Sequence, residues 1–184
     1  MASQTPQCPF PRIAHTDRID TIEDQFFDFI RILDKQEEKW FNDQPFPDEW
    51  IEDAGWLDYH AMMDLDNIDE RLARTAHAIW RVDTQLNRID QIIRWIDSKI
   101  AKITAYVPKH MLEYMNQDEK YHRLGNAYPV VAWLVDQRQG VAKDGTRIGY
   151  VYEQLKYRNV AKNLERIERL LYHIKNQENK NGKT

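Results

Sequence analysis

The fold of this chain is decided by residues 65–107, which read LDNIDERLARTAHAIWRVDTQLNRIDQIIRWIDSKIAKITAYV. Apolar residues recur in this stretch at alternating spacings of three and four, which is the heptad pattern of a helix with one buried stripe. We call this stripe the seam. Eleven of its twelve positions are Leu, Ile or Val, and the twelve are Leu65, Ile68, Leu72, Thr75, Ile79, Val82, Leu86, Ile89, Ile93, Ile96, Ile100 and Ile103. The pattern predicts one long helix with Ile89 and Ile93 buried at its centre. Pro108 should end it, because proline forces the preceding residue out of the helical region.

The two flanks of this helix carry opposite charges. With Leu65 as heptad position a, position e is acidic at Asp69, Asp83, Asp90 and Asp97. Positions c and g are basic at Arg71, Arg74, Arg81, Arg88, Lys99 and Lys102. One interpretation is a solvated surface with ion pairs between successive turns. The other is that each charged stripe selects which neighbouring helix packs on that side.

Three further residues lie off the seam. Trp80 and Trp95 occupy outer positions of the same helix. Large aromatic side chains are seldom left in water, so they predict a second contact surface. His77 lies at the outermost heptad position, and we expect it to face solvent rather than to bind a ligand.

The segments before the seam are less regular. Residues 1–15 contain three prolines and predict an extended tail, with docking of Phe10 and Ile13 on the body as the alternative. Residues 17–42 predict a helix that Thr16 caps, with one apolar face and one acidic face. In 43–64, Pro47 fits the first turn of a helix, and Gly55 leaves its end undefined.

The segments after the seam predict further helices. Residues 108–124 predict a short helix capped by Gly125. Residues 129–150 allow two interpretations: a β-hairpin that pairs 130–136 with 147–152, or a short buried helix followed by a basic loop. Residues 150–177 repeat the three–four apolar spacing and predict a last helix with a basic outer face.

These elements predict an all-α protein. Only 6 Gly and 7 Pro interrupt the 184 residues, which favours helices over turns and strands. The expected architecture is an elongated antiparallel helical bundle built on the 65–107 helix, with a small irregular or β-hairpin insert near 126–149. We expect one helical domain over 16–177, between the tail at 1–15 and a disordered tail at 178–184.

Composition excludes several classes of protein. The chain is 42% hydrophobic and 30% charged, which excludes a disordered polymer. It has no apolar run long enough to span a membrane and no basic-then-apolar leader, so we expect no membrane association. The single cysteine, Cys8, has no partner for an internal disulfide, which suits a reducing compartment. We therefore expect a cytoplasmic protein.

Charge is divided unequally along the chain. Residues 1–70 carry 5 basic and 18 acidic side chains, a net charge of −13. Residues 71–184 carry 21 basic and 12 acidic side chains, a net charge of +9. Such a division indicates that the two parts pair with each other or that each meets a different partner. We expect pairing within the chain, between the acidic face of helix 17–42 and the basic last helix.

No catalytic motif is present in the sequence. It contains neither a glycine-rich phosphate loop nor a Gly-x-Ser-x-Gly elbow. Glu119 and His122 form one Glu-x-x-His step, but a di-iron bundle needs two such steps on different helices. We therefore expect no enzyme, no cofactor, no metal and no small-molecule substrate.

The favoured function is that of a non-catalytic interaction protein, self-associating or acting as an accessory subunit. Its candidate partner surface, which would suit a basic partner, comprises Trp80, Trp95, Asp24, Asp28, Glu37 and Glu38. The alternative is a nucleic-acid-binding accessory protein that uses the basic, tyrosine-rich C-terminal third. Its candidate contacts are Arg138, Lys143, Arg147, Lys156, Arg158, Lys162, Arg166 and Arg169.

Overall fold

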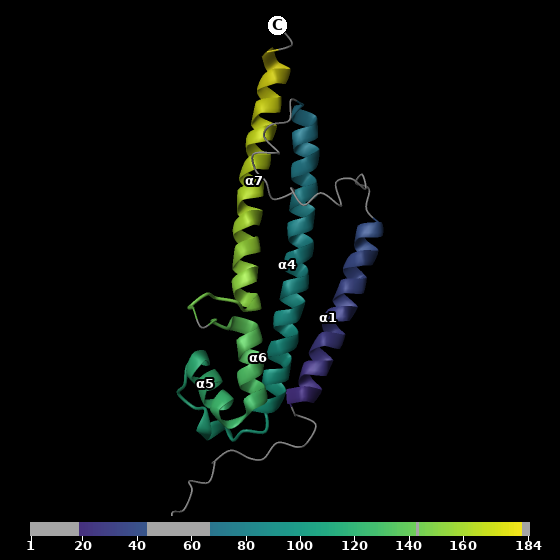
Figure 1. The fold of residues 1–184 in the computed structure, drawn as a ribbon. Coiled ribbons are helices and arrows are strands. Elements are labelled where there is room, and N and C mark those ends of the chain that lie inside the picture. The colour runs from purple at the N-terminus through teal and green to yellow at the C-terminus, as the bar shows by residue number, and fades with distance from the viewer. Residues whose placement is uncertain (1–18, 44–66, 143, 182–184) are drawn as a thin grey trace, which may run out of the picture. The chain divides into compact units, whose positions relative to one another are not determined.

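The computed structural model describes residues 19–43, 67–142 and 144–181, which are helical almost throughout (Figure 1). The helices are α1 (Ile19–Asn42), α4 (Ile68–Thr104), α5 (Gln117–Ala127), α6 (Pro129–Gln139) and α7 (Tyr150–Asn181), with a 3-10 helix at Lys109–Met111. Within these ranges there is no β-strand, so the prediction of an all-α protein is confirmed. None of the described helices combines the length and the apolarity needed to cross a bilayer. The predictions for 1–15, for the Thr16 cap and for 44–64 lie outside the described residues.

Two long helices follow the predicted boundaries closely. Helix α4 ends at Thr104, three residues before the predicted end, and 105–107 form the turn that leads to Pro108. Helix α7 continues to Asn181, beyond the predicted end at 177. The polar residues 178–181 stay helical because no breaker occurs before Gly182.

The single helix predicted over 108–124 is wrong. A 3-10 turn follows Pro108, and α5 begins only after Asn116. Asn116 and Glu119 form a capping box: the Glu119 N–H donates to Asn116 Oδ1 at 2.9 Å, and the Asn116 N–H donates to Glu119 Oε2 at 2.9 Å. This reciprocal cap starts a new helix.

Gly125 does not cap α5 but lies inside it. A Cβ at Gly125 would lie 3.4 Å from the Cα and Cβ of Ala132, so the missing side chain lets α5 approach α6 closely. Helix α5 instead ends before Pro129, which occupies the first turn of α6.

The segment 130–136 belongs to α6, so of the two interpretations the buried helix describes the structure and the β-hairpin does not. Val130, Val131 and Leu134 are buried on this helix. After it, an isolated bridge joins Val141 and Arg147, and Gly145 makes the turn with a φ of +85°. One bridge does not make a hairpin of two strands.

The chain divides into two compact units, which we describe separately. Unit 1 comprises Met1–Ile32 and Gln91–Tyr152, and unit 2 comprises Leu33–Asp90 and Glu153–Thr184. The boundary falls inside α1, α4 and α7 rather than in a linker. The prediction of one domain over 16–177 therefore stays a prediction.

Each unit has its own buried core. In unit 1 the fully buried side chains come from α4, α5 and α6, and they include Ile92, Ile96, Leu124, Val131 and Leu134. In unit 2 a cluster joins α4 to α7 and comprises Ala78, Val82, Leu164, Ile167 and Leu171. Ile89 and Ile93 are both buried, as the seam predicts.

Candidate interaction surfaces

The acidic stripe of α4 faces the helices that follow it in the chain. In unit 2, Lys175 of α7 pairs with Asp69, and Gln154 of α7 donates to Asp90. In unit 1, Asp97 Oδ1 accepts from Arg138 Nε of α6 at 2.8 Å and from the Tyr121 hydroxyl of α5 at 3.3 Å.

The basic stripe of α4 faces α1. In unit 2, Arg88 pairs with Asp34 and Glu37, and Gln85 also donates to Glu37. In unit 1, Lys99 donates to Gln25 of α1. These contacts agree with the interpretation that each stripe selects the helix on its side, because opposite charges attract and like charges repel.

Trp80 packs inside unit 2. Its ring meets Phe41 of α1 edge to face with centroids 5.3 Å apart, and it stacks on His77 at 5.9 Å. Arg81 lies 5.3 Å from the centroid of the same Phe41 ring. The expectation that His77 faces solvent is wrong, because the side chain is only 3% exposed. The aromatic contact with α1 gives α4 a second covered face, which heptad position alone does not reveal.

Trp95 packs inside unit 1, in an aromatic cluster around Phe26 of α1. Phe26 is buried, and its ring centroid lies 5.5 Å from Trp95, 5.5 Å from Trp133 and 6.1 Å from Tyr150. Phe29 stacks on Trp95 at 5.8 Å. The off-seam tryptophans therefore do mark a second contact surface of α4, and α1 occupies it.

The acidic candidate residues of α1 differ in exposure. Asp24, Asp28 and Glu38 are exposed, and Asp28 forms an exposed ion pair with Arg31 at 2.9 Å. Glu37 is half-buried against Arg88. The ion pairs that this face forms in unit 2 thus join α1 to α4, whereas we expected α1 to pair with the basic last helix.

The basic candidate residues of the C-terminal third fall into three groups. Arg138 is half-buried and is held by Asp97. Lys143 lies outside the described residues, and Arg147 is exposed in the loop before α7. The α7 residues are all exposed, and they are Lys156, Arg158, Lys162, Arg166 and Arg169. Arg169 pairs with Glu165 of its own helix at 3.4 Å.

Burial raises the pKa values of Tyr157 on α7 and of Asp83 on α4, both in unit 2. Burial, with the charges of Glu153 and Glu37 next in order, raises the pKa of Tyr157. Tyr157 packs against the unit 2 cluster, so its ring is part of that packing. Burial, and after it the carboxylate of Glu165, raises the pKa of Asp83 above its ordinary 3.8.

Glu119 and His122 serve local structure in α5. Glu119 belongs to the capping box, and His122 hydrogen-bonds Asn126 at 3.2 Å. Within the described ranges, no three His, Cys, Asp or Glu side chains gather closely enough to hold a metal ion.

The sequence pattern did not predict one feature of unit 1, which is a pocket between α4, the 3-10 turn and α5. Its lining includes Lys109, Tyr114 and Lys120, none of which belongs to a periodic pattern. The capping signature Asn116-x-x-Glu119 was the available signal, because it separates α5 from the turn that walls the pocket.

The comparisons with known proteins return nothing. No family model, no curated protein and no solved structure matches this chain.

Proposed function

We propose that the protein is a non-catalytic helical interaction protein of the cytoplasm, either self-associating or an accessory subunit of a larger complex. The observation that carries this proposal is an exposed apolar pair on α7 of unit 2. Leu170 is 59% exposed and Ile174 is 38% exposed. The two side chains are four residues apart, so they are neighbours on one helix face.

The exposed pair lies beside residues that are already buried. Leu164, Ile167 and Leu171 of α7 pack against α4 in the unit 2 cluster. Leu170 and Ile174 extend the apolar surface of α7 beyond the part that α4 covers, and Tyr172 is half exposed nearby in sequence. Covering such side chains removes apolar area from water, which stabilises the complex by roughly 25 cal/mol per Å². A helix of a second copy or of another subunit would supply that cover.

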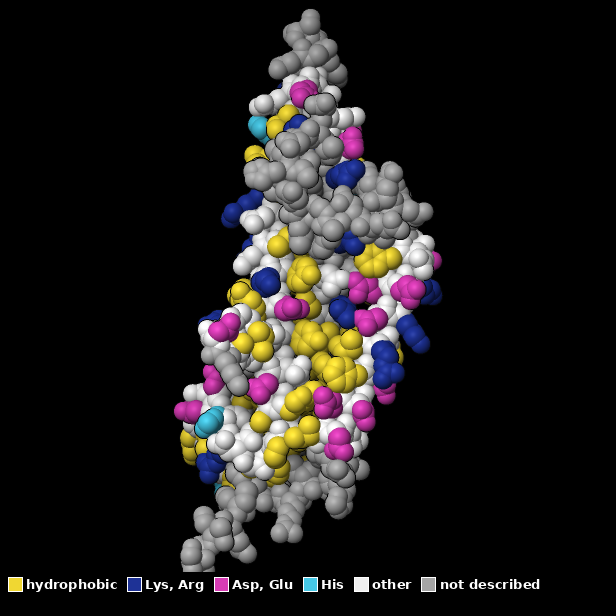
Figure 2. Space-filling view, in the orientation of Figure 1, with side chains coloured by type: hydrophobic (Ala, Val, Ile, Leu, Met, Phe, Trp, Pro, Cys, Tyr) yellow, Lys and Arg dark blue, Asp and Glu magenta, His cyan; other side chains and the backbone are white. Residues whose placement is uncertain are grey.

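Two basic side chains lie beside Leu170 on α7. Arg166 precedes it by four residues and Arg169 by one, and both are exposed. Figure 2 shows hydrophobic side chains that reach the surface between acidic and basic ones. An apolar centre with a polar margin is the usual composition of a protein interface.

We also propose that the helices of each unit form an antiparallel bundle with α4 as the shared helix. In unit 2, Asp69 meets Lys175 and Asp90 meets Gln154, so residue numbers rise on α4 as they fall on α7. The Arg88–Asp34 and Trp80–Phe41 contacts support an antiparallel α1 as well, because residue numbers fall on α4 as they rise on α1.

Sedimentation velocity tests self-association. We expect a mass above the 22.1 kDa of one chain at high micromolar concentration. The double variant Leu170→Gln/Ile174→Gln should sediment as a monomer with unchanged helicity. Val141→Gln is the matched control, because Val141 is equally exposed but lies in the unit 1 loop. A monomeric wild type at every concentration would refute self-association.

Affinity purification from the native host, with and without nuclease, tests the accessory-subunit form. We expect a partner that the wild type and Val141→Gln retain and the double variant loses. Equal recovery with the double variant would refute the role of this face.

The second candidate function is nucleic-acid binding, which one observation favours. Arg158, Lys162 and Arg166 are exposed on α7 and form no ion pair with another described residue. Accessible cations along one helix can follow a phosphate backbone. Binding of labelled single-stranded RNA and DNA by the wild type, lost at high salt and in a Lys162→Glu/Arg166→Glu/Arg169→Glu variant, would support it.

A further inference from the structure

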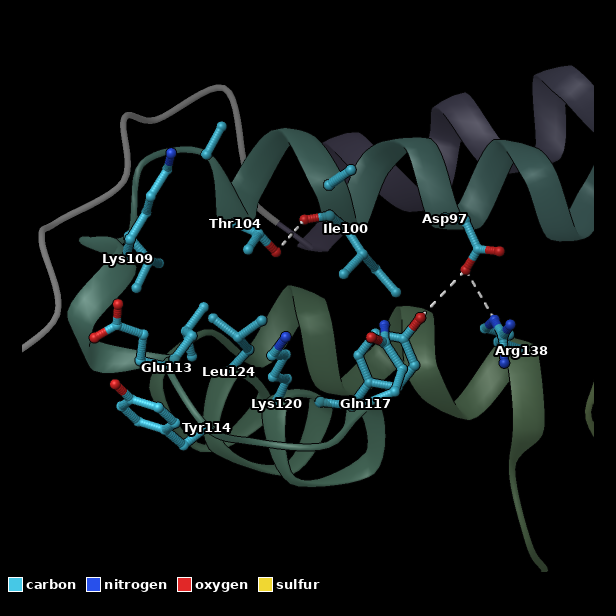
Figure 3. Close-up of a pocket in the computed structure, with 15 residues that line it drawn as sticks. Asp97, Ile100, Thr104, Lys109, Glu113, Tyr114, Gln117, Lys120, Leu124 and Arg138 are labelled. Carbon is cyan, nitrogen blue, oxygen red and sulfur yellow. Dashed lines mark hydrogen bonds and ion pairs between the residues drawn. The ribbon is translucent and has the colours of Figure 1, made fainter.

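A pocket of about 870 Å³ lies within unit 1 (Figure 3). The last turns of α4 form one wall, the 3-10 turn after Pro108 forms the end, and α5 forms the opposite wall. Arg138 of α6 reaches the other end. A volume of this size suits a small organic molecule, since such sites measure roughly 300–1,000 Å³.

The inner lining of the pocket is apolar. Ile100 of α4, Leu112 of the turn and Leu124 of α5 are buried side chains that line it from three segments. Val107 and the small Ala101 complete this part of the lining. A ligand that enters here needs a hydrocarbon or aromatic body.

The polar groups at one end already satisfy one another. Asp97 accepts from Arg138 and from Tyr121, and Figure 3 shows these bonds at the α6 end. The Arg138 guanidinium carbon also lies 5.8 Å from the centroid of the Tyr121 ring. This network leaves the Arg138 charge compensated, so the Asp97–Arg138 end does not call for an ionic ligand.

The rest of the lining carries two lysines and one acid. Lys109 and Lys120 line the pocket, and neither forms an ion pair with another described residue. Lys120 is half-buried and lines the pocket together with apolar side chains. Glu113 is the remaining acid of the lining, and it is exposed. A ligand anion that contacts Lys120 would supply the negative partner charge for this lysine.

The rim of the pocket holds a residue in a costly conformation. Tyr114 has a φ of +62°, which is unusual for any residue with a side chain. Its side chain is 100% exposed, so packing does not compensate for the conformation. Such conformations occur in tight turns and gather at ligand sites. Here the conformation places an aromatic ring at the entrance.

We propose that this pocket binds a small amphipathic carboxylate, with its apolar body against Ile100, Leu112 and Leu124 and its carboxylate on Lys120. Lys109 supplies a second cation near the entrance. A monoanion matches this lining, because Lys120 is its one half-buried lysine and Arg138 is already held by Asp97. The ligand is bound and not transformed. Because the pocket lies in unit 1 and the exposed α7 pair lies in unit 2, this proposal does not depend on the interface proposal.

Decanoate is the test ligand, titrated into the full ¹⁵N-labelled chain and followed by amide NMR shifts. We expect saturable shifts at Ile100, Leu112, Lys120 and Leu124. 1-Decanol should bind more weakly, and decyltrimethylammonium should bind least, because it brings the wrong charge to Lys120. Lys120→Gln should weaken decanoate binding about tenfold, the effect of one lost charge-assisted hydrogen bond. It should leave the binding of 1-decanol unchanged.

Lys162→Gln is the matched control, since it removes a lysine from α7 far along the sequence from the pocket lining. Its affinity for decanoate should equal that of the wild type. Three results would each overturn the proposal: shifts that do not saturate, equal affinity for the cationic surfactant, or unchanged decanoate affinity in Lys120→Gln. The dispersion of the amide spectrum shows in the same experiment that each variant is folded. The Leu170→Gln/Ile174→Gln variant should bind decanoate normally, so failure of the interface proposal leaves this one standing.

Discussion

The seam of α4 runs through both units with one repeat, yet the two units bury it to different extents. In unit 1 its residues Ile93, Ile96, Ile100 and Ile103 are all buried. In unit 2 four of its residues are only half-buried, namely Ile68, Leu72, Ile79 and Leu86. The same spacing of apolar residues therefore specifies a helix face but not how completely that face is covered.

Among the described residues, more elements pack around α4 in unit 1 than in unit 2. In unit 1, α5 and α6 add buried side chains, and the Phe26 aromatic cluster covers a further side. In unit 2 the described cover comes from parts of α1 and α7. Unit 2 also buries polar side chains on α4: Thr75 and Thr84 donate to the Arg71 and Trp80 carbonyls at 2.8 and 2.9 Å. These bonds let a hydroxyl lie inside the unit without an unmet donor.

The largest expected effect tests this contrast directly. Ile96→Ala in unit 1 removes a side chain that is 0% exposed, and it should lower the free energy of unfolding by about 2–5 kcal/mol. Ile79→Ala in unit 2 should lower it by about 1 kcal/mol, because the half-buried site loses less apolar contact and water can fill the gap. Urea unfolding measures both. Equal losses would show that the two units bury the seam equally in solution.

The next effect concerns the capping box at the start of α5 in unit 1. Asn116→Ala removes the capping box and should lower the free energy of unfolding by about 1 kcal/mol. Asn163→Ala, on the exposed face of α7, is the control. It should raise stability by a few tenths of a kcal/mol, since alanine favours helix interiors. If urea unfolding showed that both variants change the free energy of unfolding in the same direction, the capping role would be contradicted.

A smaller effect compares the ion pairs that the acidic stripe makes in each unit. Arg138→Met in unit 1 should lower stability by up to about 1 kcal/mol, because Arg138 is half-buried and also contacts Tyr121. Lys175→Met in unit 2 removes a more exposed pair with Asp69, and the change should be near zero. Thermal unfolding at low and at high salt measures both. A larger loss for Lys175→Met would reverse the ranking.

The smallest effect concerns Asp83 and Glu165 in unit 2. Because the pKa of Asp83 is raised in the folded protein, the folded state binds this proton more tightly than the unfolded chain does. The ionised group therefore opposes folding at neutral pH, and the opposition fades as pH falls through the raised pKa towards 3.8. Asp83→Asn should raise the Tm slightly at pH 7 and leave it unchanged near pH 3. A Tm below that of the wild type at pH 7 would contradict the sign.

Local pattern was sufficient to predict the long helices. The spacing of apolar residues in 68–104 and 150–177 is a property of each segment alone, and a helix is the one regular structure that puts those residues on one face. The sorting of charge along α4 was readable in the same way. Asp69 and Asp97 on one flank, and Arg88 and Lys99 on the other, point to different neighbouring helices in the structure.

The pattern was insufficient where two structures fit one segment. The apolar run at 130–135 suits a strand as well as a buried helix. In the structure it is helical, and α6 packs closely on Gly125 of α5. Residues 108–124 have helical spacing, but the Asn116 cap interrupts them. His77 occupies the outermost heptad position and is nevertheless buried; Trp80 stacks on it, and Phe41 of α1 packs on Trp80.

What the sequence alone determined was the set of helices, the apolar face of each and the sign of charge on each side of α4. These depend on residues within a few turns of one another, where the helical period fixes the geometry. Only the tertiary structure decided how deeply each part of the seam is buried, which charges are compensated, and that a pocket opens beside Lys120. Those properties depend on residues far apart in the chain, such as Asp97 and Arg138. The helical period within each segment does not predict that two such residues come into contact.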